Sequence, residues 1–114
     1  MRQAIVVLAG LLMILLAPLS HAAENKLVWQ VRKTKGIYGY LVYRSDQRQG
    51  PFLRINPVTV RTQVGAEGEE AKFEFVDRDV VAGKTYYYFI DAVGTNARKQ
   101  RLSGVMQKTV AAGE

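Results

Sequence analysis

Residues 80–93, VVAGKTYYYFIDAV, place three consecutive tyrosines after a glycine-containing corner. The residues after the corner follow the two-residue period of a β-strand, in which successive side chains point to opposite faces. One alternate set is expected to fill a core: Tyr86, Tyr88, Ile90 and Ala92. The other set is expected to face outward: Tyr87, Phe89 and Asp91. Two outward aromatic side chains on one strand indicate a surface that contacts something else.

Period-two patterns recur along the chain from Lys26 onward. Six short strands are expected, at residues 27–31, 38–45, 52–60, 72–76, 85–93 and 102–110. Polar or glycine-containing segments separate them, at residues 32–36, 45–52, 64–72 and 94–101. Short strands joined by turns at this spacing are typical of an all-β antiparallel sandwich.

The first 22 residues have the order of an export signal. Arg2 supplies a positive start, residues 5–19 are apolar, and Ser20-His21-Ala22 precedes a cleavage point at Ala23. The apolar run is short for a membrane span and contains Pro18, so a retained anchor is the weaker alternative. We expect an exported protein, periplasmic or extracellular, with no stable membrane span after cleavage.

The chain contains no cysteine, and its one histidine, His21, lies in the expected signal. The mature chain would therefore lack a cysteine nucleophile, a histidine base and the usual zinc or copper ligands. Its closest carboxylates are not held as a rigid pair. Asp77 and Asp79 lie close together in the sequence, and three further carboxylates lie in a glycine-rich segment: Glu67, Glu69 and Glu70. We expect a protein that is not an enzyme and uses no cofactor or metal. Export makes nucleic acid an unexpected partner despite the formal charge of +6.

Six segments, in the same order, resemble a fibronectin type III domain, which is an immunoglobulin-like sandwich. They are Trp29; Tyr40, Val42 and Tyr43-Arg44-Ser45; Gly50-Pro51-Phe52 with Ile55-Asn56; Phe75-Val76-Asp77; Val80, Gly83, Tyr86, Ile90 and Ala92; and Leu102-Ser103. The resemblance covers about residues 26–110. It implies a domain at residues 23–110, a frayed tail at 111–114, and structural roles for Trp29, Tyr40, Gly83 and Tyr86. Tyr86 would be the tyrosine-corner residue, whose hydroxyl bonds to upstream backbone.

This chain departs from the family at the domain's start. Only Ala23, Glu24, Asn25 and Lys26 separate the expected cleavage point from the strand at 27–31, so the family's first strand (strand A) is missing or vestigial. The strand at 27–31 would then have an unpaired edge. One possibility is that another protein, or a second copy of this chain in a homodimer, adds a strand at this edge. The other is that Lys26 and the local twist of the strand protect the edge.

Two groups of residues are candidates for binding. The alternation of side chains predicts an apolar patch on the outer face of the sheet, formed by Leu41, Tyr43, Tyr87 and Phe89. Such a patch either marks an interaction surface or only stabilises the sheet through contacts between neighbouring strands. In the resembled fold, the loops at 32–36 and 94–101 lie at one end and would gather six cations: Arg32, Lys33, Lys35, Arg98, Lys99 and Arg101. Such a group attracts phosphate, acidic polysaccharide or anionic lipid, unless the nearby glutamates neutralise it.

The sequence therefore predicts a non-catalytic binding module whose partner is a protein or an envelope glycan. The alternatives are a carbohydrate- or peptidoglycan-associated accessory module, with Tyr43 and Tyr87 stacking on sugar rings, and a homodimer through the open strand edge.

Overall fold

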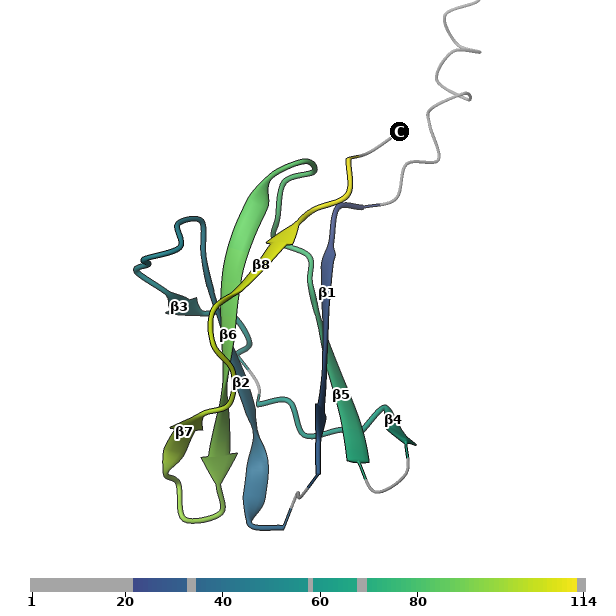
Figure 1. Cartoon of the computed structure of the whole chain (residues 1–114), viewed down its shortest axis with the longest axis vertical. Coiled ribbons are helices and arrows are strands. Elements are labelled where there is room, and N and C mark those ends of the chain that lie inside the picture. The colour runs from purple at the N-terminus through teal and green to yellow at the C-terminus, as the bar shows by residue number, and fades with distance from the viewer. Residues whose placement is uncertain (1–21, 33–34, 58, 68–69, 113–114) are drawn as a thin grey trace, which may run out of the picture.

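The structure is a computed structural model that describes residues 22–32, 35–57, 59–67 and 70–112. The described chain is all β and contains no helix. Its strands are β1 (Asn25–Val31), β2 (Ile37–Ser45), β3 (Leu53–Arg54), β4 (Gly65–Glu67), β5 (Glu70–Asp77), β6 (Thr85–Gly94), β7 (Lys99–Arg101) and β8 (Met106–Thr109). Figure 1 shows them arranged as two facing layers.

Both layers are antiparallel sheets. The smaller sheet has the order β1-β5-β4, and the larger has the order β3-β2-β6-β7, with β8 also paired to β6. The predicted antiparallel immunoglobulin-like sandwich is therefore confirmed. Residues 22–24 form no strand, and β1 is an edge of its sheet among the described residues, as expected for a fold that lacks a first strand.

The core lies between the sheets and is built from alternate residues. All four residues assigned to the inner face of β6 are buried, which confirms the parity of that strand: Tyr86, Tyr88, Ile90 and Ala92. From the opposite sheet, Trp29 stacks on Phe73 with ring centroids 6.2 Å apart and meets Tyr40 edge-on at 5.5 Å. Trp29 and Tyr40 thus have the structural positions expected of them.

The corner before β6 has the geometry that the sequence predicts. The backbone N–H of Val81 donates a 3.0 Å hydrogen bond to the hydroxyl of Tyr86. Gly83 has a φ of 83°, in the left-handed region that favours glycine. The structural roles expected of Tyr86 and Gly83 are confirmed.

Three segments differ from the sequence prediction. The described residues of 52–60 form only the short β3 and one isolated pairing of Val60 with Tyr40. Between them, the side chain of Asn56 accepts a hydrogen bond from the N–H of Val42 and donates one to the carbonyl of Tyr40, in place of a continuous backbone ladder. Residues 94–101 and 64–72, expected as loops, contain β7 and β4. The last strand begins at Met106 and not at Leu102, because Leu102 and Ser103 both bond to the backbone of Ile90 and interrupt the ladder between β7 and β8.

The expected export signal at residues 1–22 lies outside the described residues except for Ala22, and the expected frayed tail is described only as far as Ala112, without a strand. Among the described residues there is no helix long and apolar enough to cross a membrane.

Candidate functional site

The outer face of the larger sheet carries the four residues expected to form an exposed apolar patch. Tyr43 on β2 lies opposite Phe89 on β6, and their rings stack with centroids 4.6 Å apart. Leu41 is only 3% exposed, however, and Phe89 only 8%. The prediction of an exposed patch is therefore wrong.

The protein's own side chains cover this face. The ring of Phe52, from the loop before β3, lies 5.0 Å from the ring of Phe89, and the guanidinium of Arg101 lies 3.5 Å above the same ring. Both covering groups come from segments far from Phe89 in sequence. Strand parity predicts which way a side chain points, but not what packs over it.

Tyr87 is half-buried, and its ring is also covered. The guanidinium of Arg48 lies 5.1 Å from the Tyr87 centroid and is held there by a 2.7 Å hydrogen bond to Gln107. Tyr43 and Tyr87 are both only partly exposed, and the ring of Tyr43 is stacked on that of Phe89. Neither ring is as exposed as the predicted stacking on sugar rings requires.

The basic residues, in contrast, meet at one end of the sandwich as predicted. The turn after β1 and the β6–β7 hairpin lie together at the lower end of Figure 1. The N–H of Thr95 donates a 2.9 Å hydrogen bond to the carbonyl of Gly36, which ties the two loops to each other. Five of the six predicted cations are exposed at this basic end: Arg32, Lys35, Arg98, Lys99 and Arg101. The sixth, Lys33, lies outside the described residues.

Acidic residues neutralise part of this charge. Glu70 lies 3.6 Å from Arg32, and Asp91 lies 3.3 Å from Arg101. The expected approach of the acidic segment is thus seen at Glu70, while Glu69 and the side chain of Glu67 are not described. Four cations at or near this end form no salt bridge with any described residue: Lys35, Arg61, Arg98 and Lys99. The basic end therefore retains a positive charge.

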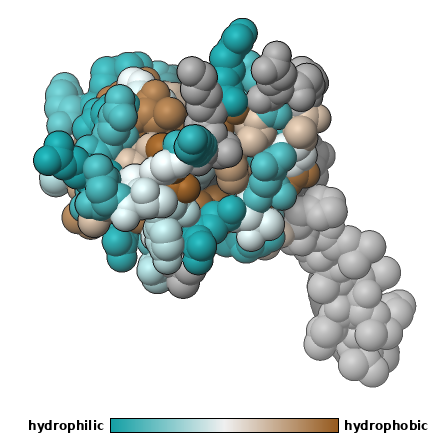
Figure 2. All heavy atoms as spheres, turned by 90° about the horizontal axis from the view of Figure 1, so that it is seen from below, coloured by the Kyte–Doolittle hydropathy of each residue, from teal (hydrophilic) through white to brown (hydrophobic). Residues whose placement is uncertain are grey.

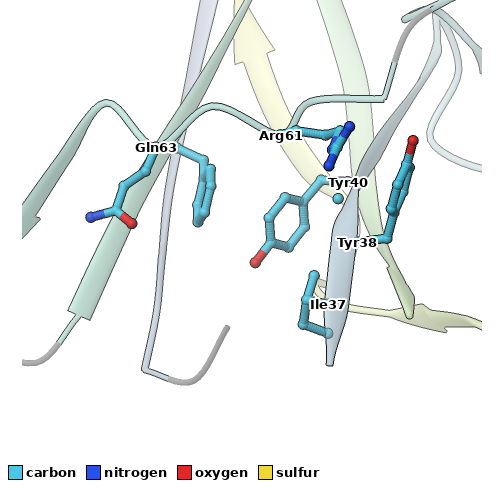
Figure 3. Close-up of a pocket in the computed structure, with 7 residues that line it drawn as sticks. Ile37, Tyr38, Tyr40, Arg61 and Gln63 are labelled. Atoms are coloured by element: carbon cyan, nitrogen blue, oxygen red, sulfur yellow. The ribbon is translucent and has the colours of Figure 1, made fainter. Parts of the chain in front are cut away.

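A cleft of about 190 Å³ opens beside this end, where β2 begins. Its lining comes from β2, β5 and the segment before β4: Ile37, Tyr38, Gly39, Tyr40, Arg61, Gln63 and Phe73. Figure 3 shows Arg61 between the rings of Tyr38 and Tyr40, with Gln63 on the far side of Tyr40. Two further hollows, of about 420 and 400 Å³, share Ile37 with this cleft.

A β-bulge presents Tyr38 to solvent. Ile37 pairs with Gly94, but Gly39 pairs with the adjacent Val93, so Tyr38 is an extra residue without a partner. Bulges redirect side chains and occur frequently beside functional sites. The Tyr38 ring is 47% exposed, which makes it one of the exposed large hydrophobic side chains of the described chain.

Gly39 allows the other wall of the cleft to approach β2. A Cβ atom at this position would overlap Cγ2 of Thr59 and lie 2.9 Å from the carbonyl oxygen of Val60. Without that atom, Tyr40 and Val60 exchange two backbone hydrogen bonds, each 2.9 Å long. This pairing fixes Arg61 next to Tyr38.

The cleft combines an aromatic ring with several hydrogen-bonding groups. The guanidinium of Arg61 lies 4.3 Å from the Tyr38 centroid, within cation–π range. The hydroxyl of Tyr40 is buried and has no hydrogen-bond partner among the described residues. Burial raises the pKa of Tyr40, so its hydroxyl stays protonated and available as a donor. Gln63 donates to the carbonyl of Gly65, which leaves its own carbonyl oxygen as an acceptor.

No carboxylate is among the cleft-lining residues that the structure describes. Seen from the basic end, Figure 2 shows hydrophobic atoms in the middle of a largely hydrophilic rim. The cleft lining combines the aromatic rings of Tyr38, Tyr40 and Phe73 with the polar side chains of Arg61 and Gln63.

Our sequence reasoning missed Tyr38, Arg61 and Gln63. The available signal was the glycine inside Ile37-Tyr38-Gly39-Tyr40, because a glycine within a strand pattern often marks a bulge or a close backbone approach. Arg61 and Gln63 carried no comparable signal, since they lie in a segment without regular periodicity.

A buried polar network lies at the opposite end of β1 and β5 from the basic end. The carboxylate of Asp77 accepts hydrogen bonds from Arg44 at 3.0 and 3.1 Å and from Tyr88 at 2.7 Å, and Asn25 donates to the Tyr88 hydroxyl at 2.9 Å. Burial, together with the bond to Asp77, raises the pKa of Tyr88 far above its usual range. Burial alone lowers the pKa of Arg44, but its bonds to Asp77 and Asp79 outweigh that effect and raise it. Each group has a partner, so the network is structural.

Comparison with known proteins gives one partial match. No family model and no solved structure matches the chain. An amylopullulanase from Thermoanaerobacter thermohydrosulfuricus is 37% identical over 60 residues, which cover 53% of this chain and 3% of that protein. The similarity thus joins about half of this chain to a small part of a much longer enzyme.

Proposed function

We propose that the protein is a non-catalytic glycan-binding module and that the cleft beside Tyr38 is its binding site. The observation that carries this proposal is the exposed Tyr38 ring, held by a β-bulge against Arg61 and next to the unpartnered hydroxyl of Tyr40. We further propose, from the sequence pattern, that the domain is of the fibronectin type III kind and that the protein is located outside the cytoplasm.

The chemistry of the cleft matches that of a sugar. A pyranose ring has an apolar C–H face, which packs on an aromatic ring, and a rim of hydroxyls. The guanidinium of Arg61 supplies donors for such a rim, and the carbonyl of Gln63 supplies an acceptor. Tyr38 is the most exposed aromatic side chain of this cleft, since Tyr40 and Phe73 are buried.

The partial match to an amylopullulanase supports the same class of ligand. The name of that protein states an action on pullulan, a glucan, and the matched segment is too small a part of it to be the whole enzyme. An accessory module that holds a glycan fits the length of the match.

The charge of the basic end favours an anionic glycan over a neutral one. Arg61, Lys35, Arg98 and Lys99 lie in or beside the three adjoining hollows and are not paired with acidic residues in the described chain. Such charge increases the local concentration of an anionic polymer. We therefore expect binding to an acidic envelope glycan to weaken steeply with added salt, because the ions screen the attraction.

Retention assays test the proposal directly. The protein is passed over immobilised pullulan and mixed with purified peptidoglycan, and bound protein is measured at low and moderate salt. The Tyr38→Ala and Arg61→Ala variants should each bind about tenfold less tightly, equivalent to one lost interaction of about 1.4 kcal/mol. Tyr87→Ala is the matched control, because it removes a tyrosine from the covered outer face and should leave binding unchanged.

The outcomes separate the alternatives. Binding to peptidoglycan that falls with salt identifies an anionic glycan, whereas salt-independent binding to pullulan identifies a neutral glucan. The proposal is wrong if the unaltered protein binds neither material, or if Tyr87→Ala weakens binding as much as Tyr38→Ala.

A further inference from the structure

The free edge of β1 is the longest unpaired strand edge in the described chain. Its seven residues pair with β5 on one side. No backbone hydrogen bond joins β1 to any other described residue. Since every second residue of an antiparallel strand turns its N–H and C=O to the same side, the other side of β1 presents a row of open backbone groups.

The other edge strands are short, although residues 73–77 of β5 also have no described strand partner on the β4 side. β3 has two residues, β4 and β7 have three each, and β8 has four. Short edge strands are one means by which proteins prevent pairing with other chains. β1 is longer, its pairing with β5 is regular from Asn25 to Val31, without a bulge and without proline, and Lys26 is the one charged residue on this edge strand.

No described segment covers this edge near its Val31 end. A hollow of about 420 Å³ lies there, between Gln30–Arg32 on one side and Gln100–Leu102 on the other. On the outer face of the same strand Val28 is 50% exposed. An added strand would therefore find both open backbone groups and apolar surface.

The sequence of β1 is complementary to itself in an antiparallel arrangement. If two copies pair about a two-fold axis at Val28, Val28 lies opposite Val28 of the second copy. Lys26, the one charged residue of β1, then lies opposite Gln30 of the second copy and not opposite another lysine. Lys26 is also 3.8 Å from Glu74 within its own sheet. This register places no like charges directly opposite each other, which would destabilise the pair.

We propose that two copies of this chain associate through β1, in antiparallel register centred on Val28, to form one continuous sheet. Closed two-fold dimers bury the same patch on both copies, and this strand edge satisfies that condition. Because the interface is small, the expected Kd is on the order of 10–100 µM. The dimer does not use the Tyr38 cleft, which lies between β2 and the segment before β4.

Sedimentation velocity, measured from well below to well above that concentration range, tests the proposal. The unaltered protein should shift from monomer to dimer. Val28→Lys and Val28→Glu should each be monomeric throughout, because each places like charges face to face across the two-fold axis. An equimolar mixture of the two variants should regain the dimer, since lysine then faces glutamate.

Two controls keep the interpretation specific. Val64→Lys changes a valine of equal exposure, 49%, near the opposite edge of the same sheet, and should leave self-association unchanged. Tyr38→Ala should also dimerise normally, whether or not it binds glycan. Recovery of the dimer in the mixture shows that the two Val28 variants are folded.

A monomer at every concentration would overturn the proposal and leave the edge to a different partner. Dimerisation that persists in Val28→Lys, or a mixture that stays monomeric although circular dichroism shows both variants folded, would equally overturn the Val28-centred register.

Discussion

The hydroxyl of Tyr88 donates a 2.7 Å hydrogen bond to Oδ2 of Asp77, and both side chains are buried. Arg44 contacts the same carboxylate from the larger sheet, so the network joins β2 and β6 to the end of β5. A buried carboxylate is tolerated only when charge and hydrogen bonds compensate for its lost hydration. This network therefore fixes how the two sheets are aligned at the end opposite the basic loops.

Removing the buried carboxylate should destabilise the fold strongly. Asp77→Ala leaves the guanidinium of Arg44 without its main partner, and we expect a loss of about 3 kcal/mol in the free energy of unfolding, measured by urea denaturation. Asp79→Ala is the control. The Asp79 carboxylate also lies near Arg44, at 3.5 Å, but it is 96% exposed and so is not part of the buried network. It should be indistinguishable from the unaltered protein; equal losses in both variants would contradict the structural role of Asp77.

Stability should fall at alkaline pH. The pKa values of Tyr40 and Tyr88 are raised in the folded state, chiefly by burial. Below a pH of about 10, the ordinary tyrosine pKa in the unfolded chain, both hydroxyls are protonated in both states and the folded state has its full stability. As the pH rises from there towards the higher pKa values of the folded state, only the unfolded chain releases these protons, and the free energy of unfolding decreases. The urea midpoint should thus decrease steadily above about pH 10. A midpoint that stays constant into that range would show that neither hydroxyl is shielded.

Two tyrosine-to-phenylalanine changes should have opposite effects. Tyr40→Phe removes a buried hydroxyl without a described partner, so the free energy of unfolding should stay constant or rise by about 1 kcal/mol. Tyr88→Phe removes a hydroxyl with two partners and should cost about 1–3 kcal/mol. If the Tyr40 hydroxyl serves a ligand, Tyr40→Phe should also bind glycan less tightly while remaining fully folded, which a combined denaturation and retention experiment would reveal.

The outer face of β6 should respond to mutation as a packed layer. Phe89→Thr removes a ring that Tyr43, Phe52 and Arg101 cover, and should cost about 3 kcal/mol in a thermal or urea unfolding experiment. Tyr87→Thr, on the same face, should cost at most about 1 kcal/mol, because that ring is half-exposed. Similar small losses at both positions would restore the idea of an open aromatic surface.

Gly39 should be intolerant of even one added carbon. Gly39→Ala brings a methyl group into the backbone of the segment at 59–61, and we expect a loss of about 2 kcal/mol together with weaker glycan binding. Gly104→Ala is the matched control, since a Cβ there meets no atom within 4 Å. Normal binding by a folded Gly39→Ala variant would mean that the wall formed by Arg61 and Gln63 is not needed.

Much of the architecture could be predicted because it depends on local periodicity. The inner residues of β6 follow from alternation alone. The hydrogen bond between Val81 and Tyr86 was expected from the resemblance to a fibronectin type III domain. The shared end of the basic loops was also predictable once the sandwich was assumed.

The candidate site was less accessible to sequence reasoning, because its parts meet through long-range contacts. The cover over Phe89 comes from Phe52 and Arg101, and the wall opposite Tyr38 comes from Arg61, which follows a segment with no regular pattern. Exposure depends on such contacts as much as on parity. A bulge adds a further difficulty, since one extra residue shifts every side chain before it to the other face.

That extra residue has an evolutionary consequence. Because Tyr38 is unpaired between Ile37 and Gly39, its deletion would leave neighbours that already pair with consecutive residues of β6. Loss of a single codon would remove this exposed ring and leave a regular ladder in its place. Under the proposed function, glycan binding can thus be gained or lost at this point while the scaffold is kept.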